Sequence, residues 1–179
     1  VTGFLAGFAA HGVALAGKRA VLIGAGGAAR AALWGLLRSG VSSVCIGVRN
    51  LAKGEALCTD FAADGTLAAY CFDDSRFRNE LCAADIVVQT TPIGMSPQTD
   101  AMPPVDPAAI RPSAAVYDLI YTPAETAFLR AAAAHGCTAI NGEIMLVMQG
   151  AEAFFLWTGV RPNTDLMQRV LREELARRG

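Results

Sequence analysis

Residues 20–29 read AVLIGAGGAA and run directly into the helical pattern RAALWGLL at residues 30–37. An apolar strand, a glycine-rich turn and a helix thus follow one another, and the free N–H groups and dipole of such a helix start attract the pyrophosphate of a dinucleotide. Gly24 permits the tight turn, Gly26 lets the backbone approach a phosphate, and Ala29 lets the helix pack closely on the strand. GxGxxA strings also occur in ordinary turns, so the flanking strand and helix are what favour nucleotide binding.

Apolar strands alternate with helical segments along the rest of the chain. We expect strands near 19–23, 43–48, 67–72, 85–89, 115–119 and 137–140. We expect helices near 27–39, 52–63, 76–83, 124–134, 143–157 and 164–178, the last of them capped by Asn163 or Thr164. This alternation predicts an α/β fold, a doubly wound parallel sheet of the Rossmann type with helices on both faces.

A long loop is predicted after the fourth strand. Residues 92–112 hold six of the eight prolines together with Gly94, and they show little periodicity. In open α/β sheets the carboxyl edge, where this loop begins, carries the ligand.

Composition excludes several classes of function. The chain has 179 residues, 53% of them hydrophobic, and a formal net charge of −1 with both signs dispersed, so nucleic acid is not an expected partner. It has no run of 18 apolar residues and no basic amino-terminal region, so neither a membrane span nor a signal peptide is indicated and a cytoplasmic location is expected. The five cysteines include no CxxC pair, which argues against a zinc site and a disulfide framework.

The end of the second strand decides the expected cofactor, because it lies beside the adenosine ribose. An acidic residue there binds the 2′-hydroxyl of NAD, whereas arginine accommodates the 2′-phosphate of NADP. Residues 48–53 read VRNLAK, in which Arg49 offers a planar fork, Asn50 a donor and Lys53 a second cation. We therefore expect NADP rather than NAD; the alternative is that both cations are solvated loop charges. The missing acid also argues against an S-adenosylmethionine site.

The chain begins with Val1 rather than methionine and enters a helical pattern at once. Phe4, Leu5 and Phe8 form an apolar stripe that ends at His11 and Gly12. The stripe covers either the domain's own sheet or a missing amino-terminal domain. We expect residues 1–14 to be a hinge helix to a missing substrate domain, 15–143 a dinucleotide-binding domain, and 144–179 helices that pack on it and toward the missing domain.

Four segments together resemble the shikimate/quinate dehydrogenase family over essentially the whole chain, as its carboxyl-terminal NADP-binding domain. They are GAGGAARA at 24–31, TTPIGM at 90–95, DLIYTPAET at 118–126 and NGEIMLVMQGAEAFFLWTG at 141–159. Two motifs depart from the usual pattern: the usual Asn-Arg-Thr is Val-Arg-Asn at 48–50, and the usual Asp-Gly is Asn-Gly at 141–142.

The resemblance assigns the binding residues. It implies a pyrophosphate site at Gly24, Ala25, Gly26, Gly27 and Ala28, and a phosphorylated-ribose site at Val48, Arg49, Asn50 and Lys53. It implies a nicotinamide site at Thr91, Pro92, Gly94, Met95, Leu119, Gly142 and Met145. Tyr121 and Gln149 match positions that touch the ring of a shikimate-like polyhydroxy acid.

Structural interpretations compete with some of these roles. Tyr121 follows a buried strand and could seal the sheet edge, and Gln149 stands on a helix that could be core alone. Asp118 is expected to hold the Tyr121 loop rather than to transfer protons. His11 and His135 each precede a glycine at a helix end and are expected to be caps, not catalytic groups.

The sequence offers no convincing proton donor for reducing a ketone, and no catalytic residue is expected within it. Family members carry a lysine and an aspartate for this purpose on an amino-terminal substrate domain. The resemblance therefore implies the NADP-binding part of a shikimate dehydrogenase, which interconverts 3-dehydroshikimate and shikimate in aromatic amino-acid biosynthesis. Quinate or an aminated shikimate is the alternative substrate. A stand-alone NADP-binding sensor or scaffold without turnover is the alternative of another class.

Overall fold

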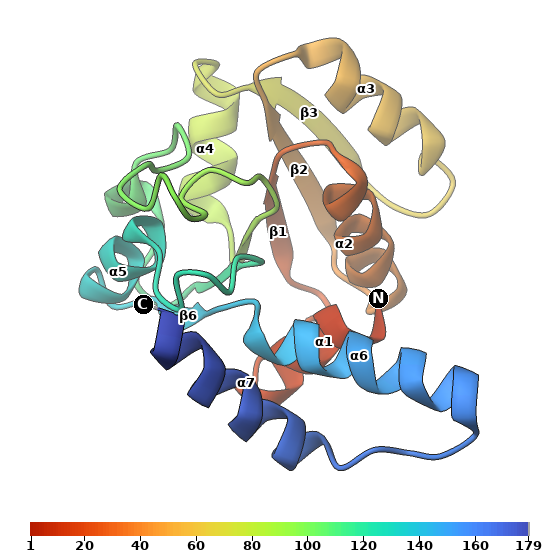
Figure 1. The fold of residues 1–179 in the computed structure, drawn as a ribbon. Coiled ribbons are helices and arrows are strands. Elements are labelled where there is room, and N and C mark those ends of the chain that lie inside the picture. The colour runs from red at the N-terminus through yellow and green to blue at the C-terminus, as the bar shows by residue number, and fades with distance from the viewer. Residues whose placement is uncertain (179) are drawn as a thin grey trace.

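Six parallel strands form one sheet in the computed structural model, which describes residues 1–178. The strands are β1 (Arg19–Ile23), β2 (Ser43–Val48), β3 (Leu67–Cys71), β4 (Ile86–Gln89), β5 (Ala115–Asp118) and β6 (Thr138–Ile140). They lie in the order β3-β2-β1-β4-β5-β6, and every neighbouring pair is parallel (Figure 1). This order confirms the predicted Rossmann-type fold, with its switch point between β1 and β4.

The helices follow the strands nearly as predicted. They are α1 (Thr2–Ala10), α2 (Gly27–Arg38), α3 (Leu51–Asp60), α4 (Ser75–Ala83), α5 (Ala127–Ala134), α6 (Glu143–Thr158) and α7 (Thr164–Arg178), with a short 3-10 helix at Pro107–Ala109. Asn163 is the cap of α7, since its Oδ1 accepts a hydrogen bond from the Leu166 N–H at 2.9 Å. No helix among residues 1–178 is long and apolar enough to cross a bilayer.

Two helix ends differ from the prediction by three residues, and the other differences among the helices expected within 27–178 are of a single residue. The helix expected at 52–63 ends at Asp60, because Phe61 leaves it and its ring lies 6.0 Å from that of Trp34. The helix expected at 124–134 begins at Ala127, because the Thr126 hydroxyl accepts a hydrogen bond from the Leu129 N–H and caps it there. Residues 124–126 thereby remain in the loop that follows β5.

Each face of the sheet has its own apolar core. On one face, strand side chains pack against α1, α2 and α3, with Leu22, Ile46 and Val88 among the fully buried members. On the other face they pack against α4 and α5, through residues such as Phe77 and Phe128. Burial on both faces explains why the strands are almost continuously apolar.

The stripe on α1 covers the domain's own sheet, which is the first of the two alternatives considered for it. Phe4 and Phe8 are buried, and their rings lie 5.4 and 5.1 Å from that of Tyr117 on β5. The approach is so close that a Cβ on Gly7 would lie 2.3 Å from the Tyr117 hydroxyl. Within the described part of the chain, that buried hydroxyl has no hydrogen-bond partner.

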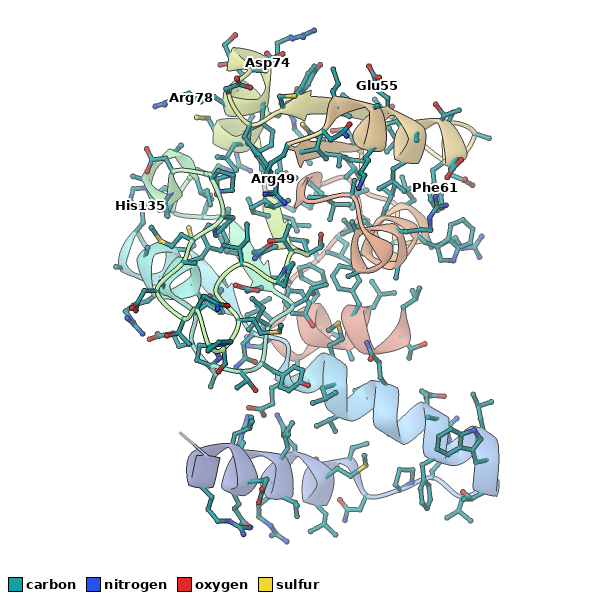
Figure 2. All side chains as sticks on the ribbon, turned by 45° about the horizontal axis from the view of Figure 1, so that its top comes forward. Arg49, Glu55, Phe61, Asp74, Arg78 and His135 are labelled. Carbon is teal, nitrogen blue, oxygen red and sulfur yellow. The ribbon has the colours of Figure 1, made fainter. Side chains whose placement is uncertain are left out.

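The last two helices pack as a pair beside α1, with α7 on the far side of α6 (Figure 2). Glu143, at the first position of α6, is buried and accepts hydrogen bonds from Gln168 Nε2 and Arg172 Nε of α7, both at 2.7 Å. A carboxylate in the first turn also complements the helix dipole. These contacts fasten α7 to the beginning of α6.

Candidate dinucleotide-binding site

The glycine-rich turn lies at the switch point of the sheet, between the ends of β1 and β4. Gly24 has a φ of +109°, and a Cβ there would lie 2.8 Å from Thr91 Cγ2 and 2.9 Å from Thr90 Oγ1. Only glycine fits this conformation and this contact. A Cβ on Gly26, by contrast, would meet nothing within 4 Å. The backbone at Gly26 therefore faces open space at the start of α2, whose first turn has no acidic residue.

A cationic cavity of about 300 Å³ opens beside this turn. It is lined by Gly24, Ala25, Gly26, Val48, Arg49, Asn50, Lys53, Phe72, Thr91, Pro92, Ile93 and Pro104. None of these lining residues, all from the described part of the chain, is an Asp or Glu, and neither Arg49 nor Lys53 forms an ion pair there. Two unpaired cations beside a helix start make this cavity suited to an anion.

The orientation of neighbouring charges supports this reading of the cavity. In Figure 2, Arg49 lies near the middle of the molecule, between α2 and the loop that follows β4. Glu55, on the same helix as Lys53, points outward on the far side of α3. The nearest acid along α3 thus leaves the cations unneutralised.

A second cavity, mainly apolar and about 400 Å³ in volume, adjoins the first at Thr91 and Pro92. It is lined by Val1, Phe4, Ala28, Ala31, Ala32, Thr90, Thr91, Pro92, Met95, Leu119, Ile120, Tyr121, Thr122, Met145 and Gln149. Its polar side chains carry hydroxyls and one amide, and among these described residues there is no Lys, Asp, Glu or His. The volumes of both cavities are typical of small-molecule sites.

The structure brings together all but three of the residues that the sequence nominates. The exceptions are Gly27, Gly94 and Gly142, which line neither cavity. Gly142 serves packing: a Cβ there would lie 2.1 Å from the Leu119 carbonyl oxygen, and its N–H donates to the Ile120 oxygen at 2.9 Å. It brings the start of α6, with Met145, against Leu119.

Gly94 also acts through packing. It has a φ of +94°, and a Cβ there would lie 2.9 Å from the Ala101 carbonyl oxygen. Gly94 therefore closes the loop that carries Met95 rather than lining a cavity. Gly27 begins α2, where a Cβ would meet nothing within 4 Å.

Asp118 holds the Tyr121 loop, as expected from the sequence. Its carboxylate accepts hydrogen bonds from the Ile120 N–H at 3.1 Å and from the Thr126 hydroxyl at 2.8 Å. Burial raises the pKa of Asp118 to about 6, while these two hydrogen bonds act in the opposite direction. The two histidines lie where predicted, His11 at the carboxyl end of α1 and His135 at that of α5.

Sequence reasoning missed several members of the site. Phe72 and Pro104 come from segments without a motif and reach the cationic cavity only through the fold. Gln89, completely buried at the end of β4, touches neither cavity but bonds to the loop between them. A polar residue that ends an apolar strand is the one signal that pointed to Gln89. Within residues 1–178 no group of three His, Cys, Asp or Glu is placed to hold a metal ion.

The strand order, the glycine turn and two adjoining cavities at the switch point define a Rossmann-type domain of the dinucleotide-binding class. The sequence profile described as "Shikimate / quinate 5-dehydrogenase" matches residues 8–95, and that of the "Shikimate 5'-dehydrogenase C-terminal domain" matches residues 144–172. The chain belongs to the shikimate/quinate dehydrogenase family and corresponds to the Rossmann-type part of its members.

Relatives in this family match nearly the whole chain. A shikimate dehydrogenase (NADP+) of Moorella thermoacetica is 43% identical over 176 residues, which cover 97% of this chain and 59% of the relative. The crystal structure of a Listeria monocytogenes shikimate 5-dehydrogenase with shikimate and NAD matches with a TM-score of 0.88 and 28% identity, covering 95% of this chain and 61% of that one. A Thermus thermophilus enzyme with NADP(H) and shikimate gives a TM-score of 0.80 and 34% identity, covering 99% and 60%. The chain thus spans about three fifths of the length of these relatives.

Proposed function

We propose that the chain binds NADP(H) and forms the cofactor-binding part of a dehydrogenase that interconverts 3-dehydroshikimate and shikimate. The observation that carries the proposal is the pairing of a cationic cavity at the glycine turn with an apolar cavity that carries Tyr121 and Gln149. The relatives named as shikimate dehydrogenases, one with NADP+ in its name and another solved with NADP(H), support the same assignment.

The residues present fit NADP better than NAD. The open space at Gly26 admits a pyrophosphate next to the N–H groups at the start of α2. Arg49, Asn50 and Lys53 would hold the 2′-phosphate, and no acid lines the cavity in the described residues to bind a free ribose diol. Charge-assisted hydrogen bonds contribute about 1.5–3 kcal/mol each, enough for a ten- to hundredfold preference.

The second cavity would receive the nicotinamide, which supplies hydride transfer when bound. Thr91, Pro92, Met95, Leu119 and Met145 form its mainly apolar wall and would shield the reacting carbon from water. The exposed polar ends of Tyr121 and Gln149 would orient the hydroxyl groups of a polyhydroxy ring from one side.

The groups that move the hydroxyl proton would come from outside this chain. Ketone reduction needs a proton donor, and the described lining of the apolar cavity has no lysine, carboxylate or histidine. We assign this proton transfer to a lysine and an aspartate. We place both in a domain that corresponds to the part of the relatives not matched by this chain.

One face of α6 is suited to contact such a substrate domain. Gln149, Leu156 and Trp157 follow one another at i, i+7 and i+8 and so share a face. Leu156 is 79% and Trp157 84% exposed. These two exposed apolar side chains thus lie further along the helix face that reaches the cavity at Gln149, where a substrate domain would bury them.

Quinate remains the closest alternative substrate, because the matching family profile covers shikimate and quinate enzymes alike. An aminated shikimate presents the same ring to Tyr121 and Gln149. An activity assay of the full-length protein with shikimate, quinate and the aminated ring in turn would distinguish the three substrates. No residue specifically supports the alternative of a stand-alone NADP-binding sensor.

For the proposed dehydrogenase we also propose a cytoplasmic location.

Isothermal titration of the chain with NADPH and NADH tests the cofactor assignment. We expect NADPH to bind more tightly, and Arg49→Ala to weaken NADPH about ten- to hundredfold while NADH changes little. Arg38→Ala is the matched control, because Arg38 lies at the end of α2 and lines neither cavity. Absence of binding for both cofactors, or equal losses for both in Arg49→Ala, would contradict the assignment.

A further inference from the structure

Gln89 is a completely buried polar residue at the last position of β4, beside the switch point. In the sheet register it lies between Ile23 of β1 and Asp118 of β5. Its side chain faces the core that also contains Val87, two residues earlier on the same strand. A buried amide in such surroundings costs free energy unless all its hydrogen bonds are made.

The Gln89 amide makes all four of its hydrogen bonds to one loop. Its Oε1 accepts from the Thr91 N–H at 2.7 Å and from the Thr91 hydroxyl at 2.9 Å. Its Nε2 donates to the carbonyl oxygens of Thr91 at 3.1 Å and Ile93 at 3.0 Å. The amide thus fixes the path of residues 91–93 without itself reaching either cavity.

That loop is the wall common to the two cavities. Thr91 and Pro92 line both, and Ile93 lines the cationic one. On its other side the loop is tied to the glycine turn, because the N–H and the hydroxyl of Thr90 donate to the Ile23 carbonyl oxygen at 3.1 and 2.7 Å. Movement of residues 91–93 would change how the two cavities are placed relative to each other.

We propose that Gln89 is a positioning residue that sets the alignment of the cationic and apolar cavities, so that one ligand can occupy both. The inference rests on the proposed function, in which that ligand is NADP(H). Arg49, Asn50 and Lys53 stand on a different segment, after β2, and the hydrogen bonds of Gln89 go to Thr91 and Ile93 instead. The side chain of Gln89 should therefore matter for a ligand that spans both cavities and little for one that fills the cationic cavity alone.

The test compares NADPH with adenosine 2′,5′-bisphosphate, which carries only the adenosine end. We measure the ratio of their dissociation constants in the wild type, in Gln89→Leu and in Gln89→Glu, which keeps the size but cannot donate when ionised. We expect both variants to lower the advantage of NADPH by roughly tenfold while binding of the bisphosphate stays nearly constant. Val87→Ala is the control for lost stability. It opens a cavity on the same strand and face but leaves the hydrogen bonds between Gln89 and residues 91–93 in place.

An unchanged ratio in the Gln89 variants, or an equal change in Val87→Ala, would overturn the inference. Failure of the wild type to bind either ligand would instead overturn the proposed function. Hydrogen exchange of the wild type provides a measurement that does not depend on a folded variant. The Thr91 amide should be protected like the strand amides; exchange at the rate of an exposed loop would equally refute the role of Gln89.

Discussion

Asp118 places an ionisable carboxyl group where water does not reach, beneath the loop that carries Tyr121. Its pKa is raised from 3.8 to about 6 by burial, so between these values the folded chain binds more protons than the unfolded chain. Its contribution to stability is therefore greatest at low pH and is lost as the pH rises through about 6. At 1.36 kcal/mol per pKa unit, the loss is about 2–3 kcal/mol.

Asp118→Asn should remove this dependence. The amide keeps an oxygen for the Ile120 N–H and offers an N–H to the Thr126 hydroxyl, but it does not ionise. We expect the stability of the wild type relative to the variant to fall between about pH 4 and about pH 7 by that amount. Urea unfolding of both proteins across this range measures it. A constant difference at every pH would show that Asp118 titrates normally.

Single residues also mark the limit of prediction from sequence. The cations at 49 and 53 and the turn at Gly24 were found because their spacing after a strand has a direct chemical meaning. Gly142 was placed at the nicotinamide by resemblance, whereas its close contact with the Leu119 carbonyl oxygen is visible only in three dimensions. Gln89 was overlooked because three of its four hydrogen bonds are to main-chain groups, which carry no sequence signal of their own.

At the scale of elements, α1 shows how tightly a helix can be fitted to a sheet. Replacing an exposed helical glycine by alanine normally stabilises a helix by about 1 kcal/mol. Gly7→Ala should do the opposite, because the new Cβ would lie 2.3 Å from the Tyr117 hydroxyl oxygen and 2.6–2.8 Å from the ring. We expect a loss of about 1–3 kcal/mol in the free energy of unfolding, the usual cost of overpacking.

Gly150→Ala on α6 is the matched control for this prediction. Its nearest neighbour would be the flexible end of Met167 at 3.3 Å, so a small gain in stability is expected there. Chemical denaturation of both variants gives the comparison. If Gly7→Ala were as stable as the wild type, the packing of α1 against β5 would be looser than described.

Most elements were predictable because apolar strands and helical periodicity are local properties. The two helix ends that differ are set by side-chain contacts that helical periodicity does not reveal. Thr126 starts α5 while also bonding Asp118, and Phe61 leaves α3 to reach Trp34 on α2. The apolar stripe on α1 also had two possible partners, the domain's own sheet and another domain. Only the three-dimensional structure shows that it packs against Tyr117 of the sheet.

At the scale of the whole molecule, the proposed division of work predicts that residues 1–179 alone do not turn over substrate. General acid–base assistance is typically worth about 10²- to 10⁴-fold, and holding both reactants in place contributes more. Under the proposed function, the proton-transfer pair and the second side of the substrate site come from outside this chain. We expect no detectable NADP-linked oxidation of shikimate or quinate, measured by NADPH absorbance.

The full-length Moorella thermoacetica relative serves as the positive control, and binding of NADPH to the chain shows that the sample is folded. Brisk oxidation of shikimate by the chain alone would place the proton-transfer groups within it. Tyr121 would then be the first residue to re-examine, because it is the phenol at the rim of the apolar cavity.

The cations of the site stand on one short stretch, residues 48–53, which runs from the last residue of β2 into the first turn of α3. The apolar cavity instead draws on α1, α2, α6 and the loops after β4 and β5. Under the proposed function, the preference for NADP or NAD therefore depends mainly on residues 48–53. A lineage can change coenzyme by replacing this stretch, for example with an acid in place of Arg49, while its substrate recognition is inherited intact. For the same reason, residues 48–53 can be exchanged as a unit when coenzyme preference is to be redesigned.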